Sequence, residues 1–312
     1  MNHAASPSLV AVDWGTSHLR VWLLGADGSV LAEHRSDEGM GATAREKFHT
    51  VLETHLMALA VPVDLPVVMC GMVGSRQGWA EARYLTLPAS LEDIATQAVR
   101  IPGLARDIRI MPGLAKRNDD SPDVMRGEET QLLGLHRRTP AFGDRFVCMP
   151  GTHSKWVHMQ DGTVIDFVSF MTGDAFAVLS LHSVLRHSVS GNSVDPTSTA
   201  FRDAVRASLD SPADILARIF SIRPAGLLRD LAPGESRARL SGYLIGQEIA
   251  GARARFALPD HVDLIGDQPL AALYTEALSV AGLSCHLHDS DALAIAGLAG
   301  AAAAPPKTGT DG

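Results

Sequence analysis

Cysteine is scarce in this chain of 312 residues, and its three copies, Cys70, Cys148 and Cys285, stand far apart. Neither a CxxC pair nor an HExxH pattern occurs, so a disulfide framework, a structural zinc site and a zincin site have no support. Apolar residues surround the cysteines. We therefore expect three buried, reduced thiols, as in a cytoplasmic protein.

Long apolar runs and lysine are also scarce. No apolar run is long enough to cross a bilayer, and the start MNHAASPSL lacks the basic residues and apolar core of a secretory signal. The net charge is −8, and no basic cluster is present that could meet a phosphate backbone. We expect a cytoplasmic protein with neither a nucleic-acid nor a membrane partner. The sequence leaves open whether the chain forms a homo-oligomer.

The residues that are present indicate a globular protein with more than one core. Apolar residues make up 46% of the chain, and 312 residues exceed the usual size of a single domain. The first half predicts three hairpin strands, a helix with one apolar face and an apolar strand without alternation, over 9–13, 19–24, 30–34, 45–59 and 66–75.

The second half repeats this order of elements. RFVCMPGTHSKWVHMQDGTVIDFVSFMTG predicts a strand, a P-G-T turn, a second strand, a D-G turn and a third strand, and a helix follows. Each half thus has a G-T turn after its first strand, within D-W-G-T at 13–16 and P-G-T-H-S-K at 150–155. The pattern predicts an internal duplication with its boundary at 137–144, and a disordered tail after residue 300.

The two G-T turns are suited to binding phosphate. Glycine followed by a hydroxyl residue lets backbone N–H groups and one O–H converge on an anion. A carboxylate just before the turn, as Asp13, would repel a phosphate unless a cation lies between them, and Mg²⁺ is the usual cation. Asp13 could instead be a turn-capping aspartate, and Thr16 and Thr152 could be ordinary turn residues.

The turns resemble the phosphate motifs of the hexokinase, actin and sugar-kinase superfamily. Asp13, Gly15 and Thr16 match its first motif, and Gly151 and Thr152 match its second. The resemblance implies an α/β fold of duplicated ribonuclease H-like domains with an ATP cleft between them. The domains would span 1–140, which carries the sugar-acid side, and 141–300, which carries the second phosphate motif and an adenosine motif. A tail at 301–312 would follow.

A third stretch and Lys155 add to the candidate nucleotide-binding residues. The strand V-D-L-I-G at 262–266 looks like the adenosine signature, with Gly266 as its contact, although Asp267 replaces the second glycine. Lys155, inside the second phosphate motif, could neutralise the charge of the transferring phosphoryl group. It could equally be a solvated strand residue.

The stretches DWGTSHLR, CGMVGSRQGW, DVMRGEETQLLG, PGTHSKWV and FMTGDAF narrow the resemblance to the 2-dehydro-3-deoxygalactonokinase family. It extends over nearly the whole chain, from about residue 9 to about 297. It implies ATP and Mg²⁺ as cofactors, a cytoplasmic location and phosphorylation of 2-dehydro-3-deoxy-D-galactonate at its terminal hydroxyl, in galactonate catabolism.

The general base has two candidates. Such a kinase needs a carboxylate near the acceptor hydroxyl to take its proton. Glu128 and Glu129 begin a helical pattern, where acids also stabilise the helix start. Glu128 would stand where glycerol-kinase-type enzymes place a catalytic aspartate, and we favour it as the base. Its rival is Asp174, at the start of the helix after residue 170.

A sugar acid brings a carboxylate, which a planar arginine can bind in a bidentate manner. Arg76 follows the end of an apolar strand, a place where α/β folds form ligand crevices, although it could also be a surface arginine. Ser75 and Gln77 could bind hydroxyl groups, and Arg126 is a second cation candidate. We therefore predict substrate contacts at these four residues.

Two other functions remain open at this point. A kinase of another small sugar or sugar acid would carry the same phosphate turns and differ only around Arg76. A nucleotide-binding sugar sensor that regulates transcription is the alternative of another class, but such proteins usually add a basic helix-turn-helix module. We find no such module before residue 9 or after residue 300.

Overall fold

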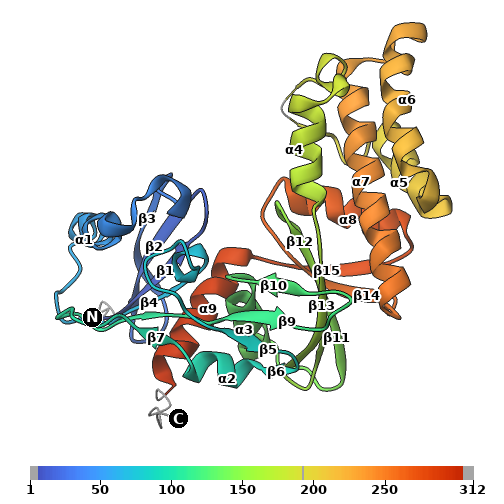
Figure 1. The fold of residues 1–312 in the computed structure, drawn as a ribbon. Helices are drawn as coiled ribbons and strands as arrows, with labels where there is room; N and C mark the ends of the chain where they lie inside the picture. Colours follow the sequence, from blue (N-terminus) through green and yellow to red (C-terminus); the bar gives the residue numbers. More distant parts are fainter. Residues whose placement is uncertain (1–5, 192, 305–312) are drawn as a thin grey trace, which may run out of the picture. The chain divides into compact units, whose positions relative to one another are not determined.

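The computed structural model describes residues 6–191 and 193–304. Within this part of the chain, two compact α/β units are present (Figure 1). The first unit contains the chain through Gly143, residues 160–166, and the chain from Ser290 onward. The second contains residues 144–159 and 167–289.

The first unit contains most of the short strands. Its strands are β1 (Pro7–Trp14), β2 (Leu19–Gly25), β3 (Val30–Ser36), β4 (Val67–Cys70), β5 (Tyr84–Thr86), β6 (Ala89–Ser90), β7 (Val99–Arg100), β8 (Ile108–Ile110), β9 (Gly113–Lys116) and β10 (Asp123–Met125). Its helices are α1 (Phe48–Ala58), α2 (Leu91–Thr96), α3 (Glu128–Arg138) and α9 (Ser290–Ala303).

The second unit contains the long helices. Its strands are β11 (Asp144–Met149), β12 (Ser154–Gln160), β14 (His261–Ile265), β15 (Ser284–His288) and the second half of β13 (Thr163–Phe170), whose first half falls in the first unit. Its helices are α4 (Thr172–His182), α5 (Thr199–Asp210), α6 (Ile215–Leu228), α7 (Pro233–Arg255) and α8 (Leu270–Val280). Helices α4, α5 and α6 pack against α7 and form a helical layer (Figure 1). None of the helices in the described residues combines the length and apolar character needed to cross a bilayer.

Five strands have the same order in the two main sheets, β3-β2-β1-β4-β8 in one and β13-β12-β11-β14-β15 in the other, and the sixth strand lies at opposite ends. In full, the first sheet is β3-β2-β1-β4-β8-β7, and the second is β15-β14-β11-β12-β13-β6. In the first sheet β1 pairs antiparallel with β2 and parallel with β4; in the second, β11 lies between β12 and β14 and pairs parallel with β14. Three meander strands followed by parallel strands on the far side of the first strand form the ribonuclease H-like arrangement. The predicted duplicated fold is therefore confirmed.

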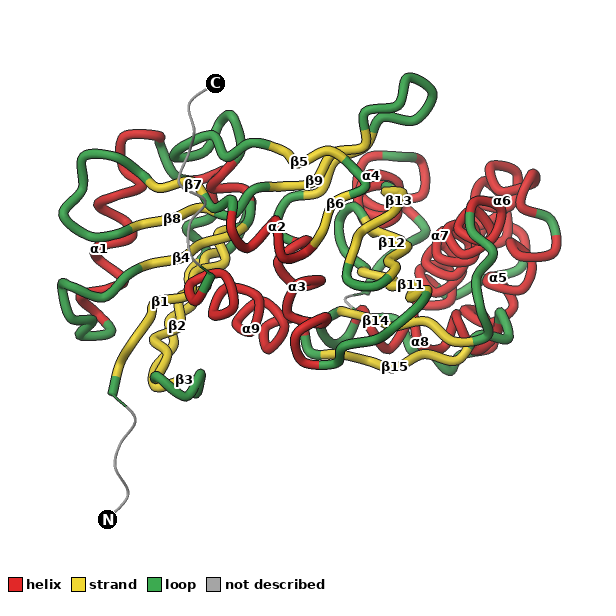
Figure 2. Tube along the Cα trace, turned by 90° about the horizontal axis from the view of Figure 1, so that it is seen from below, coloured by secondary structure: helices red, strands yellow, loops and turns green. Residues whose placement is uncertain are grey.

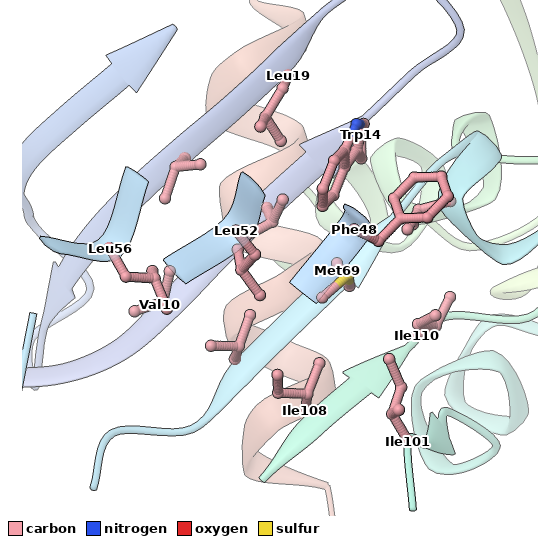
Figure 3. Packing of buried hydrophobic residues seen from close by; sticks show 14 of the residues in the cluster. Val10, Trp14, Leu19, Phe48, Leu52, Leu56, Met69, Ile101, Ile108 and Ile110 are labelled. Atoms are coloured by element: carbon pink, nitrogen blue, oxygen red, sulfur yellow. The ribbon is translucent and has the colours of Figure 1, made fainter. Parts of the chain in front are cut away.

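The core of the first unit lies directly under the first G-T turn. Trp14, the residue after Asp13, is fully buried, and its ring lies 5.0 Å edge-on from the ring of Phe48 (Figure 3). Phe48, Leu52 and Leu56 of α1 are buried on one face, as the helical spacing predicts. Burial of such side chains anchors the turn that follows β1, because each contributes about 1.5–3 kcal/mol.

The predicted apolar strand at 66–75 is shorter in the structure. β4 covers only Val67–Cys70, all four residues of which are buried. Gly71 then takes a φ of +93°, which ends the strand, and a 3-10 turn at Met72–Gly74 follows. The strand is buried as expected, but its end is set by the glycine rather than by the end of the apolar run.

The last helix departs from the sequence-based division of the chain. That division placed residues 141–300 in one domain and a disordered tail at 301–312. In the structure α9, which includes residues 301–303, belongs to the first unit and packs on α3, β1 and β4 (Figure 2). Residues 305–312 lie outside the described residues.

Glycines explain the tight packing of α9 on α3. A Cβ on Gly134 of α3 would lie 1.9 Å from the carbonyl oxygen of Leu293, and a Cβ on Gly297 of α9 would lie 2.1 Å from that of Thr130. Real Cβ atoms do not approach backbone atoms this closely. The two helices can therefore pack at this distance because each has a glycine where it meets the backbone of the other. This interlock fixes the starts of α3 and α9 relative to each other.

The close contact between α3 and α9 predicts that Gly297→Ala destabilises the protein. Alanine normally favours a helix by up to about 1 kcal/mol over glycine, but here its methyl group would push the two helices apart. We expect the free energy of unfolding to fall by about 1–3 kcal/mol in urea titrations followed by fluorescence. Gly234→Ala in α7, where a Cβ would meet nothing within 4 Å, is the control and should be neutral or stabilising. Equal effects of the two substitutions would contradict the interlock.

Candidate active site

A glycine-containing loop, residues 39–41, packs against the turn that follows β1. The N–H groups of Met40 and Gly41 donate to the carbonyls of Gly15 and Thr16, each over 2.9 Å. A Cβ on Gly39 would lie 2.3 Å from the Thr16 carbonyl oxygen, so only glycine permits this close approach. The turn is therefore held in one conformation, and Thr16 is exposed on it.

Asp13 lies where negative charge exceeds positive charge. Its Oδ2 is 3.4 Å from Arg20 Nη1, and one-fifth of its side-chain surface (20%) is exposed. Burial raises the pKa of the Asp13 carboxyl to about 6; the Arg20 guanidinium lowers this pKa, and the carboxylates of Asp291 and Glu128 raise it. A Cβ on Gly71 would lie 3.2 Å from Asp13 Oδ1, so glycine leaves space beside that oxygen.

The start of α3 brings two acids to the same unit. Gly127, with a φ of +111°, precedes the helix, and its N–H donates to Glu129 Oε2 over 2.7 Å. Glu128 Oε2 accepts the Arg126 N–H over 3.0 Å. Glu129 is fully buried, whereas Glu128 is half-buried and close enough to Asp13 to shift its pKa. Of the two acids, Glu128 is therefore the one that belongs to the Asp13 cluster.

The predicted substrate residues differ in exposure. Arg76 and Gln77 are exposed just after the 3-10 turn that follows β4, and no ion pair of Arg76 occurs in the described residues. Ser75 is buried, and its hydroxyl has no hydrogen-bond partner there. Arg76 is thus the accessible cation of this segment.

Arg126 is largely engaged by the protein itself. Its Nη2 donates to the Ala82 carbonyl over 2.6 Å, its Nε donates to the Tyr84 hydroxyl over 3.3 Å, and its guanidinium lies 4.2 Å from the centre of the Tyr84 ring. Its Nη1 is buried without a hydrogen-bond partner in the described residues. These contacts indicate a cation that stabilises the first unit, and they make Arg126 a weaker candidate than Arg76 for a substrate carboxylate.

The second G-T turn lies in the second unit, against the start of α4. The Asp174 N–H donates to the Thr152 carbonyl over 2.9 Å. A Cβ on Gly173 would lie 2.5 Å from the Gly151 carbonyl oxygen, so a glycine again permits the close approach to the turn. As in the first unit, a G-T turn after the first strand of the sheet is supported by glycine-containing backbone.

Asp174 and Lys155 flank this second turn. The Asp174 side chain is 39% exposed, and its Oδ2 lies 3.8 Å from His153 Nε2. Lys155 is buried, and its Nζ donates to the His153 carbonyl over 3.1 Å, so it is not the solvated strand residue of the alternative interpretation. The two candidate bases therefore belong to different units, Glu128 with Asp13 and Asp174 with the second turn.

A pocket of about 220 Å³ opens beside the second turn. Gly151 and Gly173 line it together with apolar side chains from α4, α7 and α8, namely Phe176, Leu244, Ile245, Leu270, Leu273 and Tyr274. Gly266 does not line this pocket, but a Cβ on it would lie 3.6 Å from Pro150, next to Gly151. The predicted adenosine segment thus ends close to a pocket that has room for a flat apolar ring.

Arg237 is a pocket residue that the sequence analysis missed. Its guanidinium lies 4.7 Å from the centre of the Phe176 ring, and its Nε is buried without a hydrogen-bond partner in the described residues. Ser241, one helical turn further along α7, lines the same pocket. In the sequence, the one signal for these pocket residues is that Arg237 and Ser241 are four residues apart and so lie on the same face of a long helix.

A buried carboxylate ties the pocket wall to the second turn. Glu248 of α7 accepts hydrogen bonds from Trp156 Nε1 over 2.9 Å, from the Tyr274 hydroxyl over 2.7 Å and from the Thr172 hydroxyl. Burial raises the pKa of Glu248, and these hydrogen bonds oppose the rise. Thr172 and Tyr274 line the pocket, so Glu248 fixes two of its walls.

The described residues contain no group of three or more His, Cys, Asp or Glu that could hold a metal ion on its own. A nucleotide-bound Mg²⁺ does not need such a group, because one or two carboxylates, water and phosphate oxygens complete its shell. The excess negative charge around Asp13 and the space left by Gly71 fit a divalent cation at Asp13.

Asp291 is a further residue that the sequence analysis missed. It lies in the first turn of α9 and pairs with Arg20 over 3.0 Å and with Arg35 over 2.6 Å. Nothing in the local pattern S-D-A-L-A distinguishes it from an acid at any helix start. Its place beside Asp13 becomes visible only when α9 is seen to belong to the first unit.

The pKa of Glu129 predicts a pH-dependent stability. Burial raises this pKa to about 8 from an ordinary value of 4.5, and the charge of Glu128 adds to the rise. Folding therefore favours the protonated acid, so this contribution to stability is complete below pH 4.5 and is lost as the pH rises towards 8.

Glu129→Gln keeps an acceptor for the Gly127 N–H but cannot ionise. Its free energy of unfolding should be close to that of the wild type at pH 5 and on the order of 2–4 kcal/mol above it at pH 8, measured in urea. Glu46→Gln, at an exposed position, is the control and should show no such gain. A gain of equal size at both pH values would rule out the protonated carboxyl.

Comparison with known proteins identifies the family. Residues 13–301 match the 2-keto-3-deoxy-galactonokinase family. A probable 2-dehydro-3-deoxygalactonokinase of Rhizobium meliloti (strain 1021) is 50% identical over 295 residues, which cover 94% of this chain and 96% of that protein. The 2-dehydro-3-deoxygalactonokinase of Escherichia coli (strain K12) is 34% identical over 276 residues, which cover 88% and 90%.

A solved structure agrees with these sequences. A crystal structure of a protein from Sinorhizobium meliloti, provisionally assigned as a 2-dehydro-3-deoxygalactonokinase, superposes with a TM-score of 0.91. The two chains are 49% identical, and the match covers 94% of this chain and 98% of the other. The family resemblance drawn from the sequence motifs is confirmed. This chain belongs to the 2-keto-3-deoxy-galactonokinase family.

Proposed function

We propose that the protein transfers the γ-phosphoryl group of ATP to the terminal hydroxyl of 2-dehydro-3-deoxy-D-galactonate, giving the 6-phosphate in galactonate catabolism. The observation that carries the proposal is the G-T turn that recurs at the same place in two sheets that share the order of five strands. Membership of the family named above supports the choice of substrate. Phosphoryl transfer asks a protein mainly to position reactants and to neutralise charge.

Each G-T turn supplies donors to phosphate oxygens. We assign phosphate binding to the hydroxyls of Thr16 and Thr152 and to the glycines Gly15 and Gly151, which allow a phosphate to come close to the backbone. The Gly15 N–H itself donates to the His18 carbonyl over 2.9 Å and closes the turn. Both threonines are exposed on turns whose backbone is fixed by neighbouring loops. Preformed donors of this kind bind charge without the cost of reorganisation. Lys155 would add positive charge beside the second turn, where its ammonium group already reaches the His153 carbonyl.

Asp13 is the residue that would hold Mg²⁺. When bound, the ion would neutralise charge on the phosphate oxygens. Asp13 fits this role because other carboxylates lie near its carboxylate and the lack of a side chain on Gly71 leaves space beside its Oδ1. The Cys70 thiol makes a long hydrogen bond to the same oxygen, over 3.9 Å. This assignment also explains why a carboxylate lies at the end of a strand whose neighbours are fully buried.

The acceptor would be bound by the first unit. Arg76 would form a bidentate contact with the carboxylate of the sugar acid, while Ser75 and Gln77 would bind its hydroxyl groups. Arg126 would stabilise this segment by packing against Gly74. A Cβ on Gly74 would lie only 2.9 Å from Arg126 Nη1. Arg76 and Gln77 are exposed and so can meet a ligand without rearrangement.

Glu128 would orient the acceptor hydroxyl and take its proton. It is half-buried at the start of α3 and lies near Asp13 in the same unit. Asp174 lies beside the second turn and is the rival base. The nucleoside of ATP would occupy the pocket beside the second turn, with Gly266 close to it and Phe176 and Arg237 in its wall.

These roles divide between the proposed domains. The N-terminal ribonuclease H-like domain would bind the sugar acid and the metal, and the C-terminal one would bind the second phosphate group and the adenosine. A cytoplasmic location and the absence of nucleic-acid and membrane partners follow from the same proposal.

The test of the function is ATP consumption by the purified protein with a panel of acceptors. The panel contains 2-dehydro-3-deoxy-D-galactonate, its gluco epimer, other sugar acids and neutral sugars. We expect the highest kcat/KM for the galacto acid. Preference for a different acceptor would point to another kinase on the same fold. Nucleotide binding without turnover of any acceptor would favour the sugar-sensing regulator.

The base assignment predicts a contrast between two variants. Glu128→Gln keeps size and hydrogen bonding but removes the proton acceptor, so kcat should fall about 100- to 10,000-fold with near-normal KM values. Asp174→Asn is the matched control and should retain most of kcat. If Asp174→Asn abolishes turnover and Glu128→Gln stays within a few-fold of wild type, the base is Asp174.

The carboxylate contact predicts a selective effect on KM. Arg76→Ala removes a charge-assisted bidentate contact that is worth about 2–4 kcal/mol, so KM for the sugar acid should rise about 30- to 1,000-fold. KM for ATP should change little. Arg45→Ala, at another exposed arginine of the first unit, is the control. An unchanged KM for the sugar acid in Arg76→Ala would place the carboxylate elsewhere, and Arg126 would be tested next.

A further inference from the structure

Glu248 is a buried acid that takes no direct part in the proposed reaction. It lies on α7, and only 1% of its surface is exposed. Its Oε1 accepts the Trp156 Nε1–H over 2.9 Å, and its Oε2 accepts the hydroxyls of Tyr274, over 2.7 Å, and of Thr172. A buried carboxylate is costly unless such hydrogen bonds replace those to water. These contacts therefore tie Glu248 firmly to three other elements of the second unit.

One of these contacts leads to the second G-T turn through α4. Thr172 is the first residue of α4, and the next two residues of the helix touch the turn. The Asp174 N–H donates to the Thr152 carbonyl over 2.9 Å. A Cβ on Gly173 would lie 2.5 Å from the Gly151 carbonyl oxygen. The hydrogen bond from Thr172 to the buried acid thus fixes the part of α4 that lies against the turn.

The other contacts lie on the far side of the same turn, in β12. This strand begins with Ser154, directly after the turn, and Ser154 is fully buried. The Ser154 hydroxyl lies 2.9 Å from the Tyr274 hydroxyl. Burial raises the pKa of Glu248, and a hydrogen bond from Ser154 is among those that oppose the rise. With Trp156 as the next donor in β12, one acid contacts both segments that border the turn.

A carboxylate suits this position better than an amide. A carboxylate has two acceptor oxygens, whereas glutamine has one oxygen and one NH₂ group. The indole N–H of Trp156 can only donate, so the amide oxygen would have to face it. The NH₂ group would then face the hydroxyls of Thr172 and Tyr274. The Thr172 hydroxyl would lose the acceptor that holds the start of α4.

We propose that Glu248 is a positioning residue that, through Thr172, holds the start of α4 against the second G-T turn, so that the turn keeps the shape that binds a phosphate group of the nucleotide. The proposal rests on the proposed function, which assigns phosphate binding to Thr152. The affinity for the phosphate part of the nucleotide depends on this contact, and the affinity for the nucleoside does not.

The test compares the affinities of adenosine and of the β,γ-imido analogue of ATP with Mg²⁺, both measured by isothermal titration calorimetry. Thr172→Val keeps the shape of the side chain but removes its hydroxyl. It should weaken binding of the ATP analogue about tenfold and change that of adenosine by less than about threefold. Thr172→Ser, which keeps the hydroxyl, should restore the affinity for the ATP analogue. Thr199→Val, the same change at the exposed first residue of α5, is the control and should change neither affinity.

Glu248→Gln tests the acid itself. Loss of a buried negative charge would by itself strengthen the binding of an anionic nucleotide, whereas loss of positioning weakens it. We expect binding of the ATP analogue to weaken about threefold to tenfold. Because both changes act on one hydrogen bond, Glu248→Gln combined with Thr172→Val should bind no more weakly than Thr172→Val alone.

Three results would overturn the proposal: tighter binding of the ATP analogue by Glu248→Gln, additive losses in the double variant, or equal losses for adenosine and the ATP analogue in Thr172→Val. If Glu248→Gln does not fold, the contrast between Thr172→Val and Thr172→Ser decides alone.

Thr152→Val separates this role of Glu248 from the proposed function. It removes a hydroxyl that is assigned to phosphate, so unchanged binding of the ATP analogue would contradict the phosphate assignment of the proposed function. If Thr152→Val weakens this binding and Thr172→Val does not, the phosphate assignment stands and the positioning role of Glu248 fails.

Discussion

The proposed active site depends on a cluster of three carboxylates in the first unit. Asp13 ends β1, Glu128 begins α3 and Asp291 begins α9, with the positive charge of Arg20 between two of them. Partly buried negative charges repel one another strongly unless a cation joins them. Burial is the main cause that raises the pKa of Asp13; the Arg20 guanidinium lowers this pKa, and the charges of Asp291 and Glu128 add to the rise. A divalent ion bound at Asp13 would favour its charged form.

The two halves of the duplication hold their G-T turns in the same way but surround them with different residues. Both present a G-T turn after the first strand, and both support it by glycine at a contact too close for a side chain. The first turn is preceded by a carboxylate, whereas the second is linked through Thr172 to the buried Glu248 and so to an apolar pocket. Under the proposed function, the first copy would bind the metal and the acceptor, and the second would bind the nucleoside.

The sequence was sufficient for features that are local in the chain. The G-T turns, the meander strands and the acids at the start of α3 lie in short contiguous motifs, and the strand order confirmed the duplicated fold. Asp291 and Arg237 escaped because their roles depend on which distant elements pack against their helices. The sequence of α9 is small and apolar on all sides, so its partner could not be read from a pattern, and its glycines gain meaning only against the backbone of α3.

Phosphorus NMR of the product shows whether the chain phosphorylates the terminal hydroxyl of its sugar acid. A phosphate on the terminal carbon couples to two protons, so incubation of the enzyme with ATP, Mg²⁺ and 2-dehydro-3-deoxy-D-galactonate should give a new phosphomonoester triplet. A doublet, which reports a phosphate on a secondary carbon, or the release of inorganic phosphate alone would contradict the account.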